Sequence, residues 1–229
     1  MPPLASLNFD LESVLGLLRQ RQPAPFVLQI GAMDGVRFDP LFPIVTVGGW
    51  RGLIVEPLPD LYRRLVDNHR GHSGFEFVNV AVTEANGVRP IYRVDPEAIR
   101  DGRTPDWAVG ISSFFNDRNS LGGVLTSAED FARVKPFVIQ EEVQCVTLPE
   151  LLSSHRVERI DLLQIDTEDY DYRIIQQMDF ARHRPAVIHL EHYVLPQEEK
   201  RACFSLLLGH GYVVGCTHKD LLATTLLRS

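Results

Sequence analysis

Acidic and histidine side chains concentrate in two segments of the sequence, each at the end of an apolar run. In "QIDTEDYDY" Asp166 and Glu168 follow the first run, and in "HLEHY" His189, Glu191 and His192 follow the second. Carboxylates and imidazoles can accept and donate protons in catalysis. The same groups can also hold a divalent cation. The two segments therefore indicate a proton-transfer site, and the lack of a tight local spacing disfavours the alternative of a cation site formed by Asp166, Glu168, Glu191 and His192.

A loop bracketed by glycines follows an earlier apolar run. In "FVLQIGAMDG" Gly31 and Gly35 flank the acidic Asp34. Glycine tolerates unusual backbone dihedrals and leaves room for a ligand beside the main chain. The loop lacks the G-x-G-x-x-G pattern of dinucleotide-binding turns, which disfavours a nicotinamide or flavin dinucleotide. Taken alone, the loop leaves a dinucleotide, a phosphate and a simple turn open.

Glu56 ends the next apolar run, 21 residues after Gly35. This is close to the spacing at which an acid accepts two hydrogen bonds from a ribose diol. Glu56 could instead cap the following helix, but Pro57 and Asp60 compete for that role. We therefore expect Glu56 to bind a ribose.

Strands and helices must alternate along the chain to position these residues. Short apolar runs predict strands over 26–30, 51–57, 75–82, 159–166, 186–192, 211–217 and 221–227, and residues 141–155 are predicted to form a strand that runs into a short helix. Helical spacing predicts helices over 9–20, 58–69, 167–180 and 196–210, and residues 87–94 are predicted to form a short edge strand.

This order predicts an α/β fold with a Rossmann-like, doubly wound and mostly parallel seven-stranded sheet. We expect a terminal antiparallel strand, and helices on both faces. Such sheets bind ligands at the carboxyl ends of their strands, near the point where strand order reverses. The acids, the histidines and the glycine loop are all predicted to lie at that edge.

The length of 229 residues predicts a single domain over 1–229. Residues 1–25 are expected to form an N-terminal helical extension. Residues 95–140 interrupt the alternation with many Gly, Ser, Asn and Asp residues. Long irregular segments inside a domain usually serve function, so we expect this insert on the substrate side.

Composition excludes several classes of protein. The chain is 45% hydrophobic and 23% charged, without an apolar run long enough for a membrane span, so we expect no membrane partner. Its net charge of −7 disfavours nucleic acid as a partner. The first residues lack the features of a secretory signal, which favours the cytoplasm. Three separated cysteines without a CxxC pair argue against a disulfide framework or a cysteine zinc site.

The linked order of motifs resembles the FkbM-type methyltransferases, class I enzymes that use S-adenosyl-L-methionine. The resemblance runs from about residue 26 to about 193, with "GY" at 211–212 also fitting. Its motifs are Gly31-Ala32-x-Asp34-Gly35, Glu56-Pro57, Asn79-Val80-Ala81-Val82, Ser112-Ser113, "VTLPELL" and "IDLLQIDTEDYDYRII". The usual "KIDVEGYE" of the family is "QIDTEDYD" here, so Gln164, Asp169 and Asp171 depart from it.

The resemblance implies a role for each motif in holding the cofactor. The loop from Gly31 to Gly35, with Ala32, would cradle the methionine part, and Asp34 would lie beside its amine. Glu56 would hold the ribose hydroxyls, and the adjacent Pro57 would also belong to the cofactor site. The strand end with Asn79, Ala81 and Val82 would border the adenine, and Asp166 would lie near the transferable methyl group.

The same resemblance implies an O-methyltransferase acting on a hydroxyl of a small molecule, either a sugar or a secondary metabolite. We expect in-line transfer with Asp166 or His192 as base, supported by His189 and Glu191. Ser112 and Ser113 would lie in a loop that covers the substrate, near Glu168.

Several alternatives remain open. We predict no resident metal, although a metal-assisted variant of the reaction is a further option. A module that binds S-adenosylmethionine without transferring methyl groups and a nucleotide-binding oxidoreductase are the competing functions. The sequence makes no prediction of oligomeric state.

Overall fold

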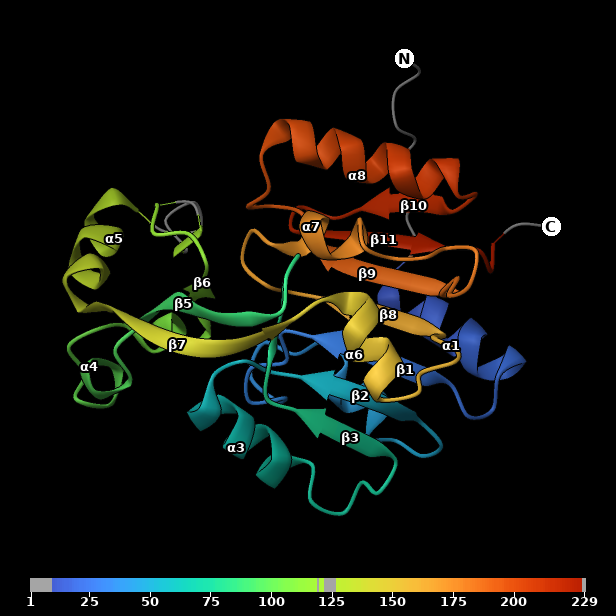
Figure 1. Ribbon diagram of the computed structural model, residues 1–229, viewed down its shortest axis with the longest axis horizontal. Helices are drawn as coiled ribbons and strands as arrows, with labels where there is room; N and C mark the ends of the chain where they lie inside the picture. The colour runs from blue at the N-terminus through green and yellow to red at the C-terminus, as the bar shows by residue number, and fades with distance from the viewer. Residues whose placement is uncertain (1–9, 119, 122–126, 228–229) are drawn as a thin grey trace.

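Two β-sheets make up the fold in the computed structural model, which describes residues 10–118, 120–121 and 127–227 (Figure 1). The strands are β1 (Phe26–Ile30), β2 (Arg51–Val55), β3 (Phe75–Val78), β4 (Ala81–Val82), β5 (Gly87–Val94), β6 (Ser112–Ser113), β7 (Val138–Val146), β8 (Leu162–Ile165), β9 (Val187–Glu191), β10 (Val213–Cys216) and β11 (Asp220–Thr224). The α-helices are α1 (Leu11–Arg21), α2 (Phe42–Val45), α3 (Pro59–Asn68), α4 (Pro96–Arg100), α5 (Ala128–Val134), α6 (Leu148–Ser154), α7 (Asp171–Ile175) and α8 (Gln197–Gly209), and 3₁₀ turns span η1 (Asp106–Gly110) and η3 (Lys135–Phe137).

The larger sheet confirms the predicted fold class. Its seven strands lie in the order β10-β11-β9-β8-β1-β2-β3. Neighbours from β9 to β3 pair in parallel, whereas β11 runs antiparallel to both β9 and β10. Because β1 pairs with β2 on one side and β8 on the other, strand order reverses between β1 and β8. A ligand site is therefore expected at the carboxyl ends of these two strands.

Helices cover both faces of the larger sheet because successive side chains of its central strands point to opposite faces and are buried on both. Leu28 and Ile30 of β1 belong to the core cluster that includes buried side chains of α6, α7 and α8. Val27 belongs instead to the cluster that includes α1 and α2. This doubly wound packing was predicted from the apolar runs.

Asp10 caps the N-terminus of α1, because its Oδ1 accepts a hydrogen bond from the amide of Ser13 at 2.8 Å. Val14, Leu15 and Leu18 are buried at helical spacing, as predicted. Residues 1–9 of the predicted N-terminal extension lie outside the described residues.

Three predicted elements were wrong in extent. Residues 75–82 are not one strand, because the chain leaves the larger sheet after Val78 and Ala81 and Val82 pair in the smaller sheet. Residues 87–94 are not a short edge strand, since β5 lies between β7 and β6. The helix predicted over 167–180 contracts to α7, because the residues before it form a loop with positive φ at Glu168 (53°) and Asp169 (83°).

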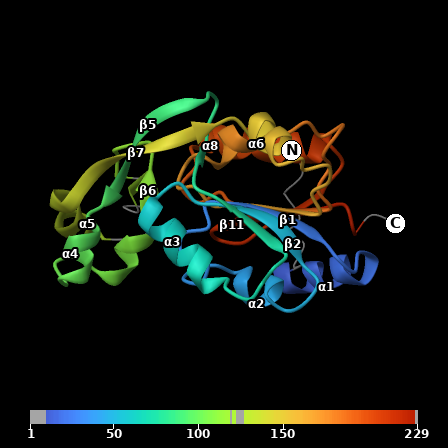
Figure 2. The same ribbon diagram turned by 60° about the horizontal axis from the view of Figure 1, so that its bottom comes forward.

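The smaller sheet, in the order β4-β7-β5-β6, lies beyond the carboxyl ends of the larger sheet (Figures 1 and 2). Its long β5 and β7 pair along their length in antiparallel fashion. Arg93 of β5, only 2% exposed, donates to Asp60 of α3 at 2.6 Å and to Glu141 of β7 at 3.1 Å. This buried ion-pair network joins the smaller sheet to a helix of the larger one.

Over the described ranges, no helix combines the length and the apolar character needed to cross a membrane.

Candidate active site

A cavity of about 560 Å³ lies at the carboxyl ends of β1, β2, β8 and β9, where strand order reverses. Its volume falls in the range of small-molecule sites, about 300 to 1,000 Å³. Both sheets contribute to its walls. Of the residues predicted for the site, eleven line the cavity: Gly31, Ala32, Glu56, Pro57, Ala81, Val82, Ser112, Asp166, Glu168, His189 and Glu191.

Gly31 allows the turn after β1 to lie directly against the end of β8. Its φ is +82°, and a Cβ at this position would lie 1.8 Å from the backbone oxygen of Asp166. The amides of Gly31 and Ala32 donate to the carbonyl of Val55 at 3.0 and 3.1 Å. Only glycine fits this position, so the turn joins the ends of β1, β2 and β8 into one floor.

Glu56 presents a buried carboxyl group to the cavity, with 3% of the residue exposed. Oε2 accepts from the amide of Met33 at 2.9 Å, and Oε1 accepts from that of Leu58 at 2.9 Å. Burial raises the pKa of Glu56 to about 8 even though both amides favour the carboxylate. Each oxygen keeps a further lone pair, so the group can still accept hydrogen bonds from a ligand.

Three residues predicted to contact the cofactor instead support the walls from behind. Asp34 Oδ1 accepts hydrogen bonds from the amides of Val36 and Arg37 at 3.0 and 2.8 Å, so its carboxylate stabilises the turn that it belongs to. A Cβ on Gly35 would lie 2.4 Å from Leu65 of α3. The third residue, Asn79, supports the part of the wall formed by Glu56 and Pro57.

Asn79 Nδ2 donates to the carbonyls of Glu56 and Pro57, both at 2.9 Å. Neither Asn79, Asp34 nor Gly35 lines the cavity. The sequence located these three motifs correctly at the strand ends, but the residues face into the protein rather than to the ligand space.

A row of polar side chains crosses three neighbouring strands beneath the cavity. Gln29, Gln164 and His189 are register partners on β1, β8 and β9, and all three line the cavity. Gln29 Nε2 donates to Asp39 Oδ2 at 3.0 Å. His189 Nδ1 lies 2.6 Å from Gln164 Oε1, and this oxygen can only accept, so Nδ1 carries the proton.

The neutral His189 ring therefore has its lone pair on Nε2, which lies 4.0 Å from Asp220 Oδ2. Burial lowers the pKa of His189, against the opposing effect of the Asp220 charge. His189 and Glu191 line the same cavity, as their two-residue spacing on a strand predicted.

Three carboxyl groups converge at one side of the cavity. Asp166, Glu168 and Glu191 each offer an oxygen, and these oxygens all lie within 4.8 Å of one another. Burial, followed by the charges of Asp220 and Asp39, raises the pKa of Asp166 to about 6. Burial and the neighbouring carboxylates raise the pKa of Glu168 well above its usual value and that of Glu191 to about 10.

Two predicted residues take different roles from those expected. His192 lies outside the cavity, and its Nε2 is 3.2 Å from the carbonyl oxygen of Thr217, so it has no access to a substrate there. Ser113 is 1% exposed and donates to the carbonyl of Glu168 at 2.8 Å. Ser112 and Ser113 form β6 rather than a covering loop, although Ser112 does line the cavity.

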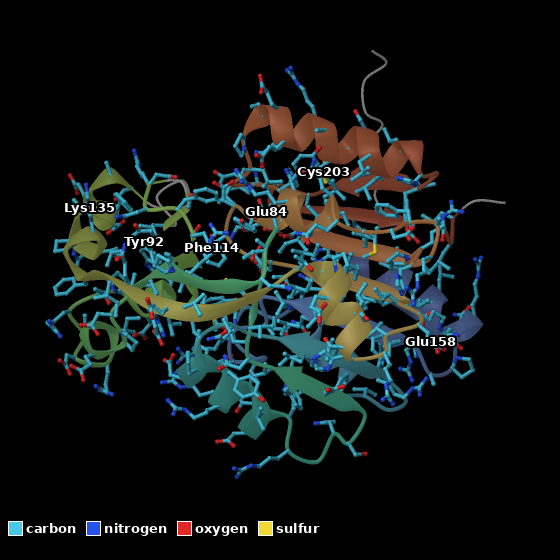
Figure 3. The ribbon with its side chains drawn as sticks, in the orientation of Figure 1. Glu84, Tyr92, Phe114, Lys135, Glu158 and Cys203 are labelled. Atoms are coloured by element: carbon cyan, nitrogen blue, oxygen red, sulfur yellow. The ribbon has the colours of Figure 1, made fainter. Side chains whose placement is uncertain are left out.

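Two further segments contribute residues that were not individually predicted, although the second lies in the 95–140 insert expected on the substrate side. Lys219 and Asp220 line the cavity because β11 is antiparallel, which brings its first residues to the carboxyl edge of the parallel strands. The terminal antiparallel strand was predicted from the sequence, and its direction could have indicated that Lys219 and Asp220 lie at this edge. Trp107 and Phe114 enter from the smaller sheet, and Figure 3 labels Phe114 between the two sheets. The Arg89 guanidinium carbon lies 4.5 Å from the centre of the Phe114 ring, which fixes this wall.

A known structure shares the fold of this chain, and two others match it more weakly. A methyltransferase FkbM from Methylobacillus flagellatus KT matches with a TM-score of 0.53 and 12% identity over 87% of this chain, which spans 43% of that protein's length. The N-terminal domain of human METTL16, in complex with S-adenosylhomocysteine, matches with a TM-score of 0.48 and 10% identity, covering 93% of this chain and 67% of that one. A precorrin-6y C5,15-methyltransferase from Geobacter metallireducens GS-15 matches with a TM-score of 0.44 and 13% identity, covering 98% and 90%. No curated protein matches the sequence.

The family model of the methyltransferase FkbM domain matches residues 29–214. This range begins in β1 and ends in β10, so it contains the glycine turn, Glu56 and the acidic cluster. The chain belongs to the FkbM methyltransferase family.

Proposed function

We propose that this protein transfers a methyl group from S-adenosyl-L-methionine to a hydroxyl oxygen of a small molecule. Family membership and the position of the cavity at the strand-order reversal support this proposal. The observation that carries it is Glu56, a buried carboxyl group at the end of β2 that faces the cavity.

The residues present fit the cofactor. Glu56 keeps acceptor capacity for the two hydroxyls of a ribose, while the amides of Met33 and Leu58 hold its carboxyl group in place. The Gly31 turn leaves the main chain open to the cavity, as a methionine moiety requires. Val80, Ala81 and Val82 supply an apolar wall beside Glu56 that suits an adenine ring.

When bound, S-adenosylmethionine supplies a methyl group that forms a bond to the acceptor oxygen as the carbon–sulfur bond breaks, leaving that electron pair on sulfur. His189 is the proposed acceptor of the hydroxyl proton, because its Nε2 lone pair is available in the cavity. Gln164 holds the ring by accepting from Nδ1, so the lone pair stays on the cavity side. This assignment replaces His192, which lies outside the cavity, as the histidine of the reaction.

The proposed acceptor is a sugar or a secondary metabolite. Trp107, Ile111 and Ser112, all within the 95–140 segment, line the cavity on the side of the smaller sheet. An aromatic ring, an aliphatic side chain and a hydroxyl together suit a ligand with both apolar and polar surfaces. We propose that this segment determines which hydroxyl is methylated. A cytoplasmic location and the exclusion of nucleic acid stay predictions.

The test is methyl transfer from labelled S-adenosylmethionine to a panel of sugars and hydroxylated metabolites. We expect transfer to at least one class, and a loss of at least about 100-fold in turnover for His189→Ala, the usual contribution of a general base. Binding of S-adenosylhomocysteine without transfer to any acceptor would favour the binding module. A thermal shift with NAD and none with S-adenosylhomocysteine would favour the oxidoreductase.

A further inference from the structure

The acidic cluster formed by Asp166, Glu168 and Glu191 is not used by the proposed cofactor contacts or by His189. The three residues come from two neighbouring elements, the loop after β8 and the end of β9, and all line the cavity. Like charges at this separation repel, so the arrangement needs a positive charge or protons to balance it.

The oxygens of the cluster are available to a ligand. Within the described residues, Glu191 Oε2 and Glu168 Oε2 are buried without a hydrogen-bond partner. Glu191 is only 8% exposed, and its side chain faces the cavity. A buried carboxylate oxygen without a partner is costly, and the usual compensation is a hydrogen bond, an ion pair or a metal ion.

The positive charge of Lys219 acts on Asp166 and Glu168 only from a distance, so it compensates the cluster in part. Lys219 lines the same cavity, yet among the described residues no ion pair within 4.0 Å joins it to any of the three carboxylates. His189, on the same strand as Glu191, directs its protonated Nδ1 to Gln164. A positive charge that balances the cluster without protonating it must therefore come from a ligand in the cavity.

The spacing of the three oxygens suits a divalent cation. Ligand oxygens around one ion lie about 3 to 4 Å apart for Mg²⁺ and up to about 5 Å apart for Ca²⁺, from bond lengths near 2.1 and 2.4 Å. The observed limit of 4.8 Å equals the largest oxygen–oxygen separation around Ca²⁺, and either ion would draw oxygens at that limit closer together. Carboxylate oxygens are the donors that Mg²⁺, Mn²⁺ and Ca²⁺ prefer.

We propose that Asp166, Glu168 and Glu191 bind a divalent cation of this oxygen-preferring class, and that the cation orients the acceptor hydroxyl towards His189. The second part rests on the proposed function. A cation beside a hydroxyl lowers the pKa of that hydroxyl and so eases loss of its proton to a nearby base. Protein carboxylates would leave some positions on the ion for water or the acceptor.

The test uses Mn²⁺ alone as the probe, added to the full chain after removal of metals, with the free ion followed by electron paramagnetic resonance. We expect one bound ion per chain. Glu191→Gln and Glu168→Gln should each weaken binding at least about tenfold, since even residues that only orient metal ligands alter affinity by that factor. Both changes relieve repulsion between acids, so the melting temperature should not fall.

Asp169→Asn is the matched control, because Asp169 is one residue from Glu168, carries the same charge, and bonds to Ser120 rather than joining the cluster. It should change Mn²⁺ affinity less than about twofold, because a charge outside the ligand set acts only through screened attraction. Absence of Mn²⁺ binding up to about 1 mM, the weak limit of protein Ca²⁺ sites, would overturn the proposal. An equal loss of affinity in Asp169→Asn would also overturn it.

Calorimetry with S-adenosylhomocysteine separates this proposal from the proposed function. Cofactor binding and methyl transfer that persist in a chelator, without Mn²⁺ binding, would refute the cation site and leave the methyltransferase intact. Mn²⁺ binding lost in Glu191→Gln, in a protein that binds no S-adenosylhomocysteine, would support the cation site and refute its link to methyl transfer.

Discussion

Replacement of Gly31 by alanine should damage both the fold and the cavity. The added Cβ would lie 1.8 Å from the Asp166 backbone oxygen, whereas ordinary contacts at such a carbon begin at 3.4 Å. A backbone oxygen cannot rotate away as a flexible side chain does, so the turn or the end of β8 must move. Gly31 also has φ at +82°, where an L side chain is strained.

The expected cost of Gly31→Ala is the sum of two contributions. The left-handed backbone costs about 1 to 2 kcal/mol for a residue with a Cβ. Forcing an extra methyl group into a packed site costs about 1 to 3 kcal/mol more. The free energy of unfolding should therefore fall by about 2 to 5 kcal/mol, a loss of roughly 4 to 20 °C in melting temperature for a chain of this size.

Gly102→Ala provides the matched control. Gly102 has φ at +69°, but nothing lies within 4 Å of the position that a Cβ would take, so this variant carries only the backbone cost. Thermal unfolding and calorimetry with S-adenosylhomocysteine should show the larger loss of stability, and at least about tenfold weaker binding, only in Gly31→Ala. Equal melting temperatures in the two variants, with unchanged affinity in both, would refute the argument that this turn and the Asp166 strand end form one packed floor.

Three further predictions concern the supports of the cavity. Arg93→Met should lower the free energy of unfolding by about 1 to 3 kcal/mol at pH 7, because two carboxylates lose a buried partner that donates charged hydrogen bonds. Burial pushes the pKa of Asp60 up, but the hydrogen bond and charge of Arg93 bring it below 3.8, so this stabilisation is complete above that pH and disappears as pH falls through the lowered pKa. Denaturant titrations should show the difference between wild type and Arg93→Met narrowing below about pH 4, and a constant difference would contradict the assignment. Asp34→Ala should lower the free energy of unfolding by about 1 to 2 kcal/mol, because the hydrogen bonds from the amides of Val36 and Arg37 are lost. Asp34→Asn keeps an acceptor oxygen and should retain most of that stability in denaturant unfolding. Equal losses in the two variants would indicate that the charge of Asp34 matters instead. Asn79→Ala should weaken S-adenosylhomocysteine binding less than Glu56→Ala does, because Asn79 acts only through the carbonyls behind Glu56, and calorimetry that ranks them in reverse would refute this.

The sequence predicted the larger sheet well because its central strands are short, mostly apolar and buried on both faces. The run Leu53 to Val55 and the run Leu162 to Ile165 are buried throughout, so length and composition alone identify them. The predicted antiparallel end was also confirmed, since β11 reverses direction against β9.

The smaller sheet could not be predicted, because its pairing is not local. Residues 87–94 pair with residues 138–145, and more than forty residues lie between them. Polar residues interrupt both strands, and the ion pairs of Arg93 that stabilise them become visible only when α3 is in place. The end of β3 at Val78 also depends on a contact that is distant in sequence, because the side chain of Asn79 donates to the carbonyl of Glu56 after β2.

At the site, the sequence located strand ends but could not determine side-chain direction. Asp34 and Asn79 follow apolar runs just as Glu56 and Asp166 do, yet only the last two line the cavity. His192 lies one residue beyond β9, where the two-residue alternation no longer governs its direction. Such outcomes depend on hydrogen bonds made after the chain has folded.

The most direct test of the central claim is calorimetric titration of S-adenosylhomocysteine into wild type and Glu56→Gln, with Glu97→Gln as a control for the loss of an exposed acid. The cavity and its buried Glu56 predict one site per chain in wild type and in Glu97→Gln. Glu56→Gln should bind at least about tenfold more weakly, because the amide nitrogen of Gln can only donate and leaves a buried donor without its acceptor, which costs about 1 to 3 kcal/mol. Equal affinity in all three folded proteins, or no binding to wild type, would contradict the claim that this cavity holds the cofactor.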